Sequence, residues 1–412
     1  MQPMAGRVPD ADYQVMQQFI TDSPWDPKEL MDKTIQMMNK EVSDPDGIIL
    51  LDDTSFPKQG NHSVGVGRQY CGALGKVANC QVAPSALYTI PSIVRNRDAI
   101  TWPLGMELYL PKKWIADKKR REETGIPKNV KFKEKWLIGL GLIDNARKLG
   151  VRHCAITTDC GYGNISEFRT ELRARIEPYV VGVTSTAIGV IPAETILLKP
   201  EDFPPARSRR PRTRLHLPPG VISKNAAEIA KEIPKEDWRD IRWTEEDKEL
   251  HGLYAMRYVR IIKHGHSCTD EICWLLLEKR DEEELKAYLC WGFAEPSLEL
   301  FVKISRNRFH IEKGYREMKD ELGIDHFEGR SWNGWHHHTV LTQITYGYLA
   351  YTRFESQNDD DDDEPLPTIP EVRRDIVKEI ALKVYEDLFG VDITKKYDRG
   401  RKRFSDFLAK MT

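Results

Sequence analysis

The chain has 412 residues, of which 40% are hydrophobic and 31% charged, and its formal net charge is −2. This length exceeds one compact core, so we expect two to four domains of a globular protein. No apolar run approaches the roughly 18 residues of a membrane span, and the first residues lack the apolar segment of a signal peptide. The seven scattered cysteines indicate reduced thiols in the cytoplasm.

The N-terminal quarter predicts two helices followed by strands. Residues 10–22 and 26–42 read as helices, the first capped by Asp10 or Asp12 and the second started by Asp26 with Pro27. The apolar run 48–51 predicts a strand that leads directly into two aspartates. Residues 62–90, rich in Gly, Val and Tyr, predict two further strands that form a meander with the first.

The next segment alternates helices with strands. Residues 131–150 predict a helix that ends at Gly150, and 151–163 a strand that ends at Asp159. A helix capped by Asn164 and a strand over 178–184 follow. The order of three strands, helix, strand, helix and strand predicts an α/β fold with a mixed five-stranded sheet flanked by helices.

The pattern changes after Thr184. We expect an inserted, basic, partly β subdomain with strands at 253–263 and 271–280, and then a long helix over 296–323, broken near Ile304. The expected regions are an N-terminal helical region (1–46), a core in two parts (47–184 and 296–356), the insertion (185–295), an acidic and Pro-rich linker (357–370), and a C-terminal helix with a basic tail (371–412).

Acidic residues stand where strands end. Asp52 and Asp53 follow four apolar residues, and burying an unpaired charge costs several kcal/mol. Such acids hold a metal ion, a proton in transit or a helix N-terminus. Asp159 stands at a second strand end, and Asp52 and Asp53 point to opposite sides because side chains alternate along a strand.

A third acid lies in the long helix. At about 100° per residue, one helix face within about 80° would carry an acid flanked by cations and a phenol. Its members are Ser305, Arg308, Glu312, Tyr315 and Lys319. A solvated face with ordinary ion pairs would explain the same pattern.

Together these stretches resemble the DDE transposases of bacterial insertion sequences. The matching motifs are DDTSFPKQG at 52–60, TTDCGYG at 157–163 and RNRFHIEKGYREMKDELG at 306–323. Arg308, Glu312 and Lys319 match the Y-x2-R-x3-E-x6-K helix signature of one cut-and-paste group, whereas Ser305 stands at its Tyr position. The resemblance runs from about residue 7 to about residue 390. It implies an RNase H-like core with a β-rich insertion between the second and third acids.

The resemblance also implies an activity and a set of site residues. Asp53, which is followed by Thr, Asp159 and Glu312 would bind two Mg²⁺ or Mn²⁺ ions. The enzyme would cut transposon ends in double-stranded DNA and join them to target DNA, as a homodimer on the DNA in the nucleoid region of the cytoplasm. The residues expected to contact DNA are Arg308, Tyr315, Lys319, Arg207, Arg209, Arg210, Arg212 and Arg214.

Other readings stay open on the sequence alone. The chain could be a catalytically idle DNA-binding descendant of a transposase, or a glycosidase with a carboxylate pair. If excision passes through a DNA hairpin, Trp274 or Trp291 could receive a flipped base, although core packing is the simpler role. The His and Cys residues of 264–273 could bind zinc, and 336–338 (HHH) could pack or contact the DNA backbone.

Overall fold

The computed structural model describes residues 12–91, 99–202, 215–245, 248–263, 267–280, 284–356, 366–389 and 410. The chain forms two compact units, each treated separately below: Met1–Cys154 with Phe309–Thr412, and Ala155–Arg308. This division by compactness does not test the expected regional boundaries, which stay predictions. No helix in the described ranges is both long enough and apolar enough to cross a membrane.

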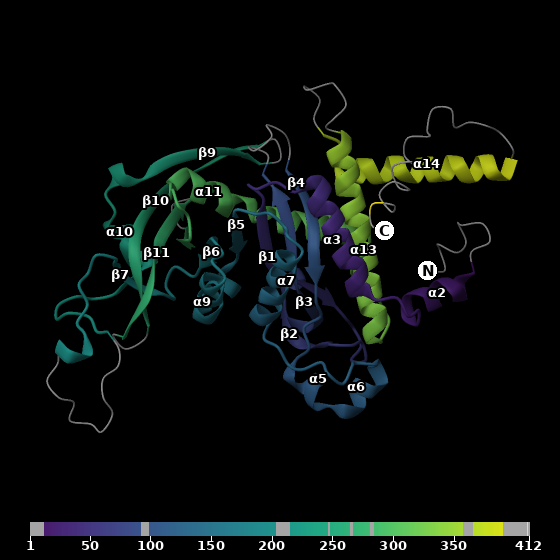
Figure 1. Ribbon diagram of the computed structural model, residues 1–412, viewed down its shortest axis with the longest axis horizontal. Coiled ribbons are helices and arrows are strands. Elements are labelled where there is room, and N and C mark those ends of the chain that lie inside the picture. The colour runs from purple at the N-terminus through teal and green to yellow at the C-terminus, as the bar shows by residue number, and fades with distance from the viewer. Residues whose placement is uncertain are drawn as a thin grey trace. The chain divides into compact units, whose positions relative to one another are not determined.

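An antiparallel sheet lies at the centre of the first unit (Figure 1). Strand β3 (Lys76–Ile90) pairs with β1 (Ile48–Pro57), β2 (Gly67–Cys71) and β4 (Ile100–Met106). The four apolar residues that open β1 are completely buried, which explains why this segment enters the core as a strand. β2 and β3 confirm the two strands predicted within 62–90, but β3 lies between β1 and β2, so these three strands are not a meander in chain order. β4 was not predicted.

The helices that pack on this sheet come from both segments of the first unit, the one that ends at Cys154 and the one that begins at Phe309. α7 contacts β3 and β1, α12 contacts β1 and β4, and α13 contacts β4. The helices of this unit are α2 (Tyr13–Thr21), α3 (Pro27–Val42), α5 (Lys112–Ala116), α6 (Lys118–Thr124), α7 (Lys135–Lys148), α12 (Phe309–Asp320), α13 (Trp332–Glu355) and α14 (Ile369–Phe389), with a 3-10 turn at Gly72–Leu74.

The local signals at helix ends are mostly confirmed. Asp12 and Asp26 accept hydrogen bonds from backbone N–H groups of the first turns of α2 and α3, and Pro27 is the first residue of α3. Gly150 follows α7 with a φ of 75°, a conformation that glycine adopts without strain. Asn164 does not cap the next helix: α9 follows Ile165, and the Asn164 side chain instead bonds Thr184.

The predicted long helix is two helices. α11 (Leu298–Asn307) ends before Arg308, and α12 begins at Phe309, so the break lies at Arg308 rather than near Ile304. Ser305 is buried and donates to the carbonyl oxygen of Val302. The predicted common face therefore holds only from Phe309 onward, and it does not include Ser305.

The second unit holds one parallel strand pair and a set of antiparallel strands. β5 (Ala155–Thr158) runs parallel to β6 (Tyr179–Val183), joined through α8 (Cys160–Gly163) and α9 (Ser166–Ala174). The mixed α/β sheet with flanking helices is thus confirmed, and the order of its elements agrees with an RNase H-like core.

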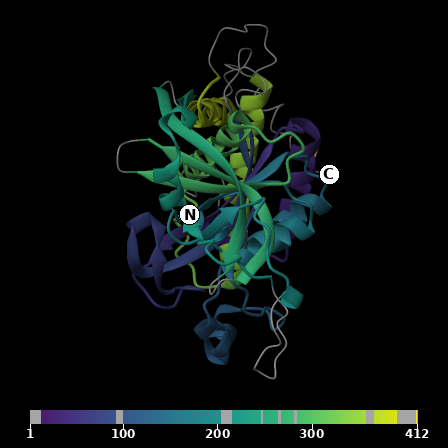
Figure 2. The ribbon, with the colours of Figure 1, turned by 90° about the vertical axis from the view of Figure 1, so that its left-hand side faces the viewer.

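The strands of the expected insertion continue from β6. β12 (Leu285–Trp291) pairs with β6, and β11 (Ser267–Lys279) pairs with both β12 and β10 (Lys248–Lys263). Figure 2 shows this part of the unit from its strand-rich side. β10 and β11 confirm the two predicted strands. The remaining elements are β7 (Gly189–Pro192), β8 (Lys224–Asn225), β9 (Arg239–Glu245), α10 (Ala226–Glu232) and 3-10 turns at Pro200–Asp202 and Lys235–Asp237.

A buried ion pair joins α9 to β11. Arg169 is 1% exposed and donates from Nε and Nη2 to the two carboxylate oxygens of Glu271, at 2.7 and 3.0 Å. Arg173 lies 2.8 Å from the same carboxylate, and Arg169 Nη1 donates to the carbonyl oxygen of Gly163. Removing one member would leave a buried charge without its partner, so this network holds α8 and α9 against the sheet.

We predict that Gly163→Ala destabilises the second unit. A Cβ at this position would overlap the carbonyl oxygen of Gly182 in β6, so α8 would have to move away from the strand. The expected cost is about 2 kcal/mol or more, seen as a lower midpoint in urea unfolding followed by tryptophan fluorescence. Gly141→Ala in α7 is the matched control, because nothing lies within 4 Å of its Cβ. It should leave stability unchanged or raise it by up to about 1 kcal/mol; equal losses in both variants would contradict the prediction.

Candidate active site

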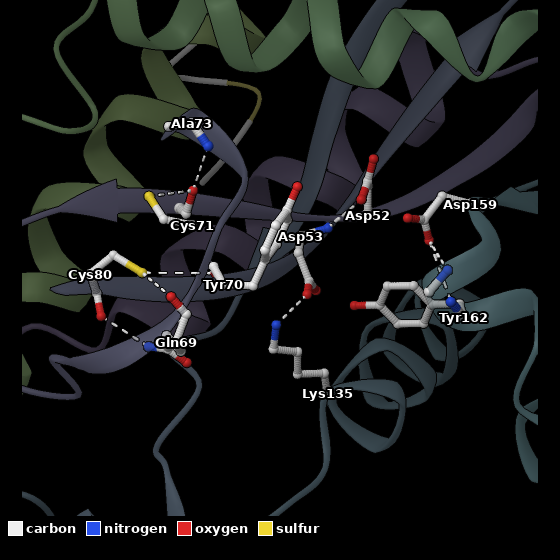
Figure 3. Close-up of polar contacts among 12 residues, drawn as sticks. Asp52, Asp53, Gln69, Tyr70, Cys71, Ala73, Cys80, Lys135, Asp159 and Tyr162 are labelled. Carbon is white, nitrogen blue, oxygen red and sulfur yellow. Dashed lines mark hydrogen bonds and ion pairs between the residues drawn. The ribbon is translucent and has the colours of Figure 1, made fainter. Parts of the chain in front are cut away.

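β1 continues to Pro57, so its two aspartates lie in mid-strand rather than at the predicted strand end, and they interrupt a run of buried residues. Ile48 to Leu51 are completely buried, Asp52 and Asp53 are half-buried, and Thr54 is buried again. Figure 3 shows the two carboxylates directed away from each other, as alternation along a strand requires. The two acids therefore meet different neighbours.

Asp53 faces α7. Its Oδ2 accepts a hydrogen bond from Lys135 Nζ at 2.7 Å, and the two side chains are 26% and 34% exposed (Figure 3). Lys135 is the first residue of α7. Nothing in the sequence marks this lysine among its neighbours Lys131 and Lys133, so sequence reasoning missed it.

Asp52 lies on the opposite face, which α12 covers. Its Oδ1 accepts from the backbone N–H of Asp53 at 2.7 Å, and its carbonyl oxygen accepts from the Tyr315 hydroxyl at 3.0 Å. Asp52 pairs with Ser85 across the sheet, and the Ser85 hydroxyl also bonds that of Tyr315. Directly opposite residues of an antiparallel pair share a face, so Tyr315 marks the Asp52 face as the one under α12.

α12 carries the predicted third acid at its start. Glu312 is exposed, whereas Tyr315, one turn later, is buried. Lys319 follows on the same side of the helix, with its Nζ 3.4 Å from the carbonyl oxygen of Ser55 and 5.9 Å from the centre of the Phe56 ring. Burial lowers the pKa of Lys319, and the nearby Asp325 opposes this shift. This helix face therefore runs along β1, the strand that carries both aspartates.

The other acid of this helix that could compete for the role points elsewhere. Glu317 accepts a hydrogen bond from the Tyr346 hydroxyl of α13 at 2.6 Å. Burial raises the pKa of Glu317, while the bond from Tyr346 and the cations Lys313, Arg353 and Arg316 oppose the rise. Glu317 thus fastens α12 to α13, and the structure separates it from the face of Glu312.

Asp159 lies in the second unit, where it follows β5. Its Oδ1 accepts from the backbone N–H groups of Gly161 and Tyr162 at 2.9 and 3.3 Å, so it caps the short helix α8 (Figure 3). The carboxylate is half-buried. One of the roles considered for a strand-end acid, a helix cap, is therefore present at Asp159.

Several predicted residues take packing roles or fall outside the description. Tyr315 is buried and its hydroxyl bonds Asp52 and Ser85, so it has a packing role, and its expected contact with DNA stays a prediction. Arg308 is half-buried and caps the end of α11. The five arginines of 206–214 lie outside the described residues, as do His264 and His266 of the candidate zinc stretch.

The aromatic and histidine candidates have protein neighbours. Trp274 lies 4.9 Å from Tyr258, and Trp291 stacks on Tyr179, measured between ring centres. His337 is buried, stacks on Trp25 and lies within hydrogen-bonding distance of the carbonyl oxygens of Ile20 and Trp25. The packing role expected for the histidine run is therefore present at His337.

The acids present the chemistry that a hard divalent cation prefers. Carboxylate oxygens are the usual ligands of Mg²⁺, and Asp53 already holds a positive charge in the form of the Lys135 ammonium. Within the described ranges, no three His, Cys, Asp or Glu side chains form a group that could hold a metal ion. The donor types fit a divalent ion, although the structure does not show them gathered around one.

Comparisons with known proteins place these acids in a chain that is similar to DDE endonucleases and to a transposase. A family model described as a DDE superfamily endonuclease matches residues 1–249, which include Asp53 and Asp159. The chain is also 26% identical over 185 residues to a protein of Microchaete diplosiphon named as a probable transposase for insertion sequence element IS701. That similarity covers 44% of this chain and 44% of the relative.

We predict that Tyr315→Phe loosens α12 from the sheet. The change keeps the ring but removes the hydroxyl, and it leaves the buried Ser85 hydroxyl without this partner. The expected loss is about 1–3 kcal/mol of unfolding free energy, measured by urea denaturation. Tyr70→Phe serves as the control, because Tyr70 is 62% exposed and its hydroxyl should matter little. A loss of the same size in Tyr70→Phe would refute the structural role assigned to Tyr315.

Proposed function

Because the chain belongs to the DDE superfamily of endonucleases, we propose that it is an insertion-sequence transposase that cuts transposon ends and joins them to target DNA. The observation that carries the proposal is the family match over residues 1–249, more than half of the chain. The relative named as a probable transposase supports the same class over a shorter stretch. Two copies of the chain would act together on the two DNA ends, as the resemblance implies.

The proposed site uses one acid from each of three segments. Asp53 of β1, Asp159 after β5 and Glu312 of α12 would hold two Mg²⁺ or Mn²⁺ ions. When bound, such ions activate the attacking water or 3′-hydroxyl and stabilise the leaving oxygen. Glu312 lies beyond the range of the family match, so its assignment rests on the helix signature and on the position of α12 against β1.

The cations of the same region would hold the DNA. Lys319 lies on the Glu312 side of α12, and Arg308 immediately precedes that helix. A guanidinium group can bind a phosphate through two parallel hydrogen bonds, whereas an ammonium acts as a point charge. The arginines of 206–214 would add contacts to the phosphate backbone that do not depend on base sequence.

Asp52 is the alternative first acid. The pattern of an acid followed by Thr favours Asp53, whereas the position of Tyr315 places Asp52 on the face that α12 covers. Because β1 presents one acid to each face, replacing each aspartate in turn can decide between the two assignments.

The first test compares the two aspartates and the metal requirement. Cleavage of a duplex that carries an insertion-sequence end should require Mg²⁺ or Mn²⁺ and stop in excess EDTA. Asp53→Asn should abolish cutting while DNA binding persists, and Asp52→Asn should reduce it much less. Activity in EDTA would refute the metal mechanism. Loss in Asp52→Asn alone would move the first-acid role to Asp52, and binding without cleavage by the unaltered protein would favour a catalytically idle descendant.

The second test separates the acids of α12. Glu312→Gln should lower the cleavage rate by at least about a thousandfold, because a ligand of the transition-state metal ions is lost. Glu317→Gln is the matched control: it makes the same change on the same helix and can still accept the bond from Tyr346. Single-turnover cleavage and gel-shift affinity should be measured for both. Near-normal cutting by Glu312→Gln would remove Glu312 from the site.

A further inference from the structure

The Asp53–Lys135 ion pair places a cation on the carboxylate assigned to metal binding. The Nζ–Oδ2 distance is 2.7 Å, and both groups are about one-third exposed or less. An ammonium and a divalent ion seek the same carboxylate oxygens, and Coulomb repulsion keeps two such cations from sharing them closely. A metal ion that binds Asp53 must therefore compete with Lys135.

The location of Lys135 is unfavourable for a lysine in isolation. It is the first residue of α7, where the positive end of the helix dipole disfavours a cation. The Asp53 carboxylate offsets that cost, and the Tyr109 ring lies 5.6 Å from the ammonium. Lys135 thus reaches Asp53 of β1 from a backbone position that the start of α7 fixes.

We propose that Lys135 is a stand-in cation that occupies Asp53 in the DNA-free protein and must leave before a divalent ion binds there. This inference rests on the proposed function, since it takes Asp53 as a metal ligand. Lys135 keeps the carboxylate oriented, and it lowers the affinity of the resting protein for metal. Lys135 is therefore a positioning residue that raises the threshold for metal binding.

Partial exposure makes the exchange feasible. Ion pairs at exposed sites contribute about 0.2–1 kcal/mol, a range that corresponds to about 1.4- to 5-fold in an equilibrium constant. A pair of this strength can hold Asp53 in the resting protein and still yield to an ion with two charges. A fully buried pair would separate much less readily, because each charge would then be left buried without a partner or water to solvate it.

The experiment measures Mn²⁺ binding to the DNA-free protein by the electron paramagnetic resonance signal of free Mn²⁺. Lys135→Met should tighten binding by about threefold, in line with the strength of a part-exposed ion pair. Lys135→Arg, which keeps the charge, should stay near the unaltered protein. Lys131→Met is the matched control: it removes one positive charge from an exposed lysine four residues earlier and should change affinity much less.

The sign of the change distinguishes competition from a purely structural role. If Lys135 only orients Asp53 as a ligand, Lys135→Met should weaken Mn²⁺ binding, and weaker or unchanged binding would overturn the proposal. Circular dichroism checks folding, and Lys135→Gln replaces Lys135→Met if the latter unfolds. Mn²⁺ binding that survives Asp53→Asn would overturn the inference and favour Asp52 as the ligand. The absence of saturable Mn²⁺ binding in the unaltered protein, with no metal-dependent cleavage, would overturn the proposed function as well.

Discussion

The hydroxyl group of Tyr315 is the contact on which the candidate site of the first unit depends. It bonds the carbonyl oxygen of Asp52 in β1 and the hydroxyl of Ser85 in β3, so one side chain ties α12 to two strands. Apolar packing alone is non-directional and leaves a helix some freedom to turn or slide on a sheet. A buried hydrogen bond has a direction and is costly to leave unmade, so it fixes both the rotation of α12 about its axis and its position along the sheet. The exposure of Glu312, one turn earlier, follows from that placement.

Alternation along β1 explains how two neighbouring acids are tolerated at the edge of the core. Side chains one residue apart point to opposite faces, so Asp52 and Asp53 do not share one environment. Asp52 accepts a backbone N–H bond and Asp53 holds the Lys135 ammonium, and each carboxylate therefore has a partner suited to a charge. One strand can thus present an acid to α7 and another to α12.

The sequence predicted what local rules determine. The caps at Asp12 and Asp26 and the glycine after α7 depend on residues a few positions apart, and all three were recovered. β4 was missed because its segment, TWPLGM within 101–106, contains Pro and Gly, which normally argue against a strand. The helix break at Arg308 has neither Pro nor Gly beside it, so the local sequence did not predict it. Lys135 escaped notice because its partner is 82 residues away, and periodicity carries no information about such a pair.

Which of the two aspartates faces α7 is a property of strand register rather than of local sequence. A slip of one residue in the pairing of β1 with β3 would exchange the faces of the Asp52 and Asp53 side chains and would turn Asp53 away from Lys135. The observed register sets Asp52 opposite Ser85, and the Tyr315 hydroxyl reaches both residues. In the slipped register Asp53 would stand opposite Ser85, and its main-chain carbonyl oxygen would take the place of that of Asp52, whereas the side-chain ion pair of Asp53 with Lys135 would be lost. The bond that positions α12 therefore accepts either aspartate, and the Asp53–Lys135 ion pair is the contact that depends on the observed register.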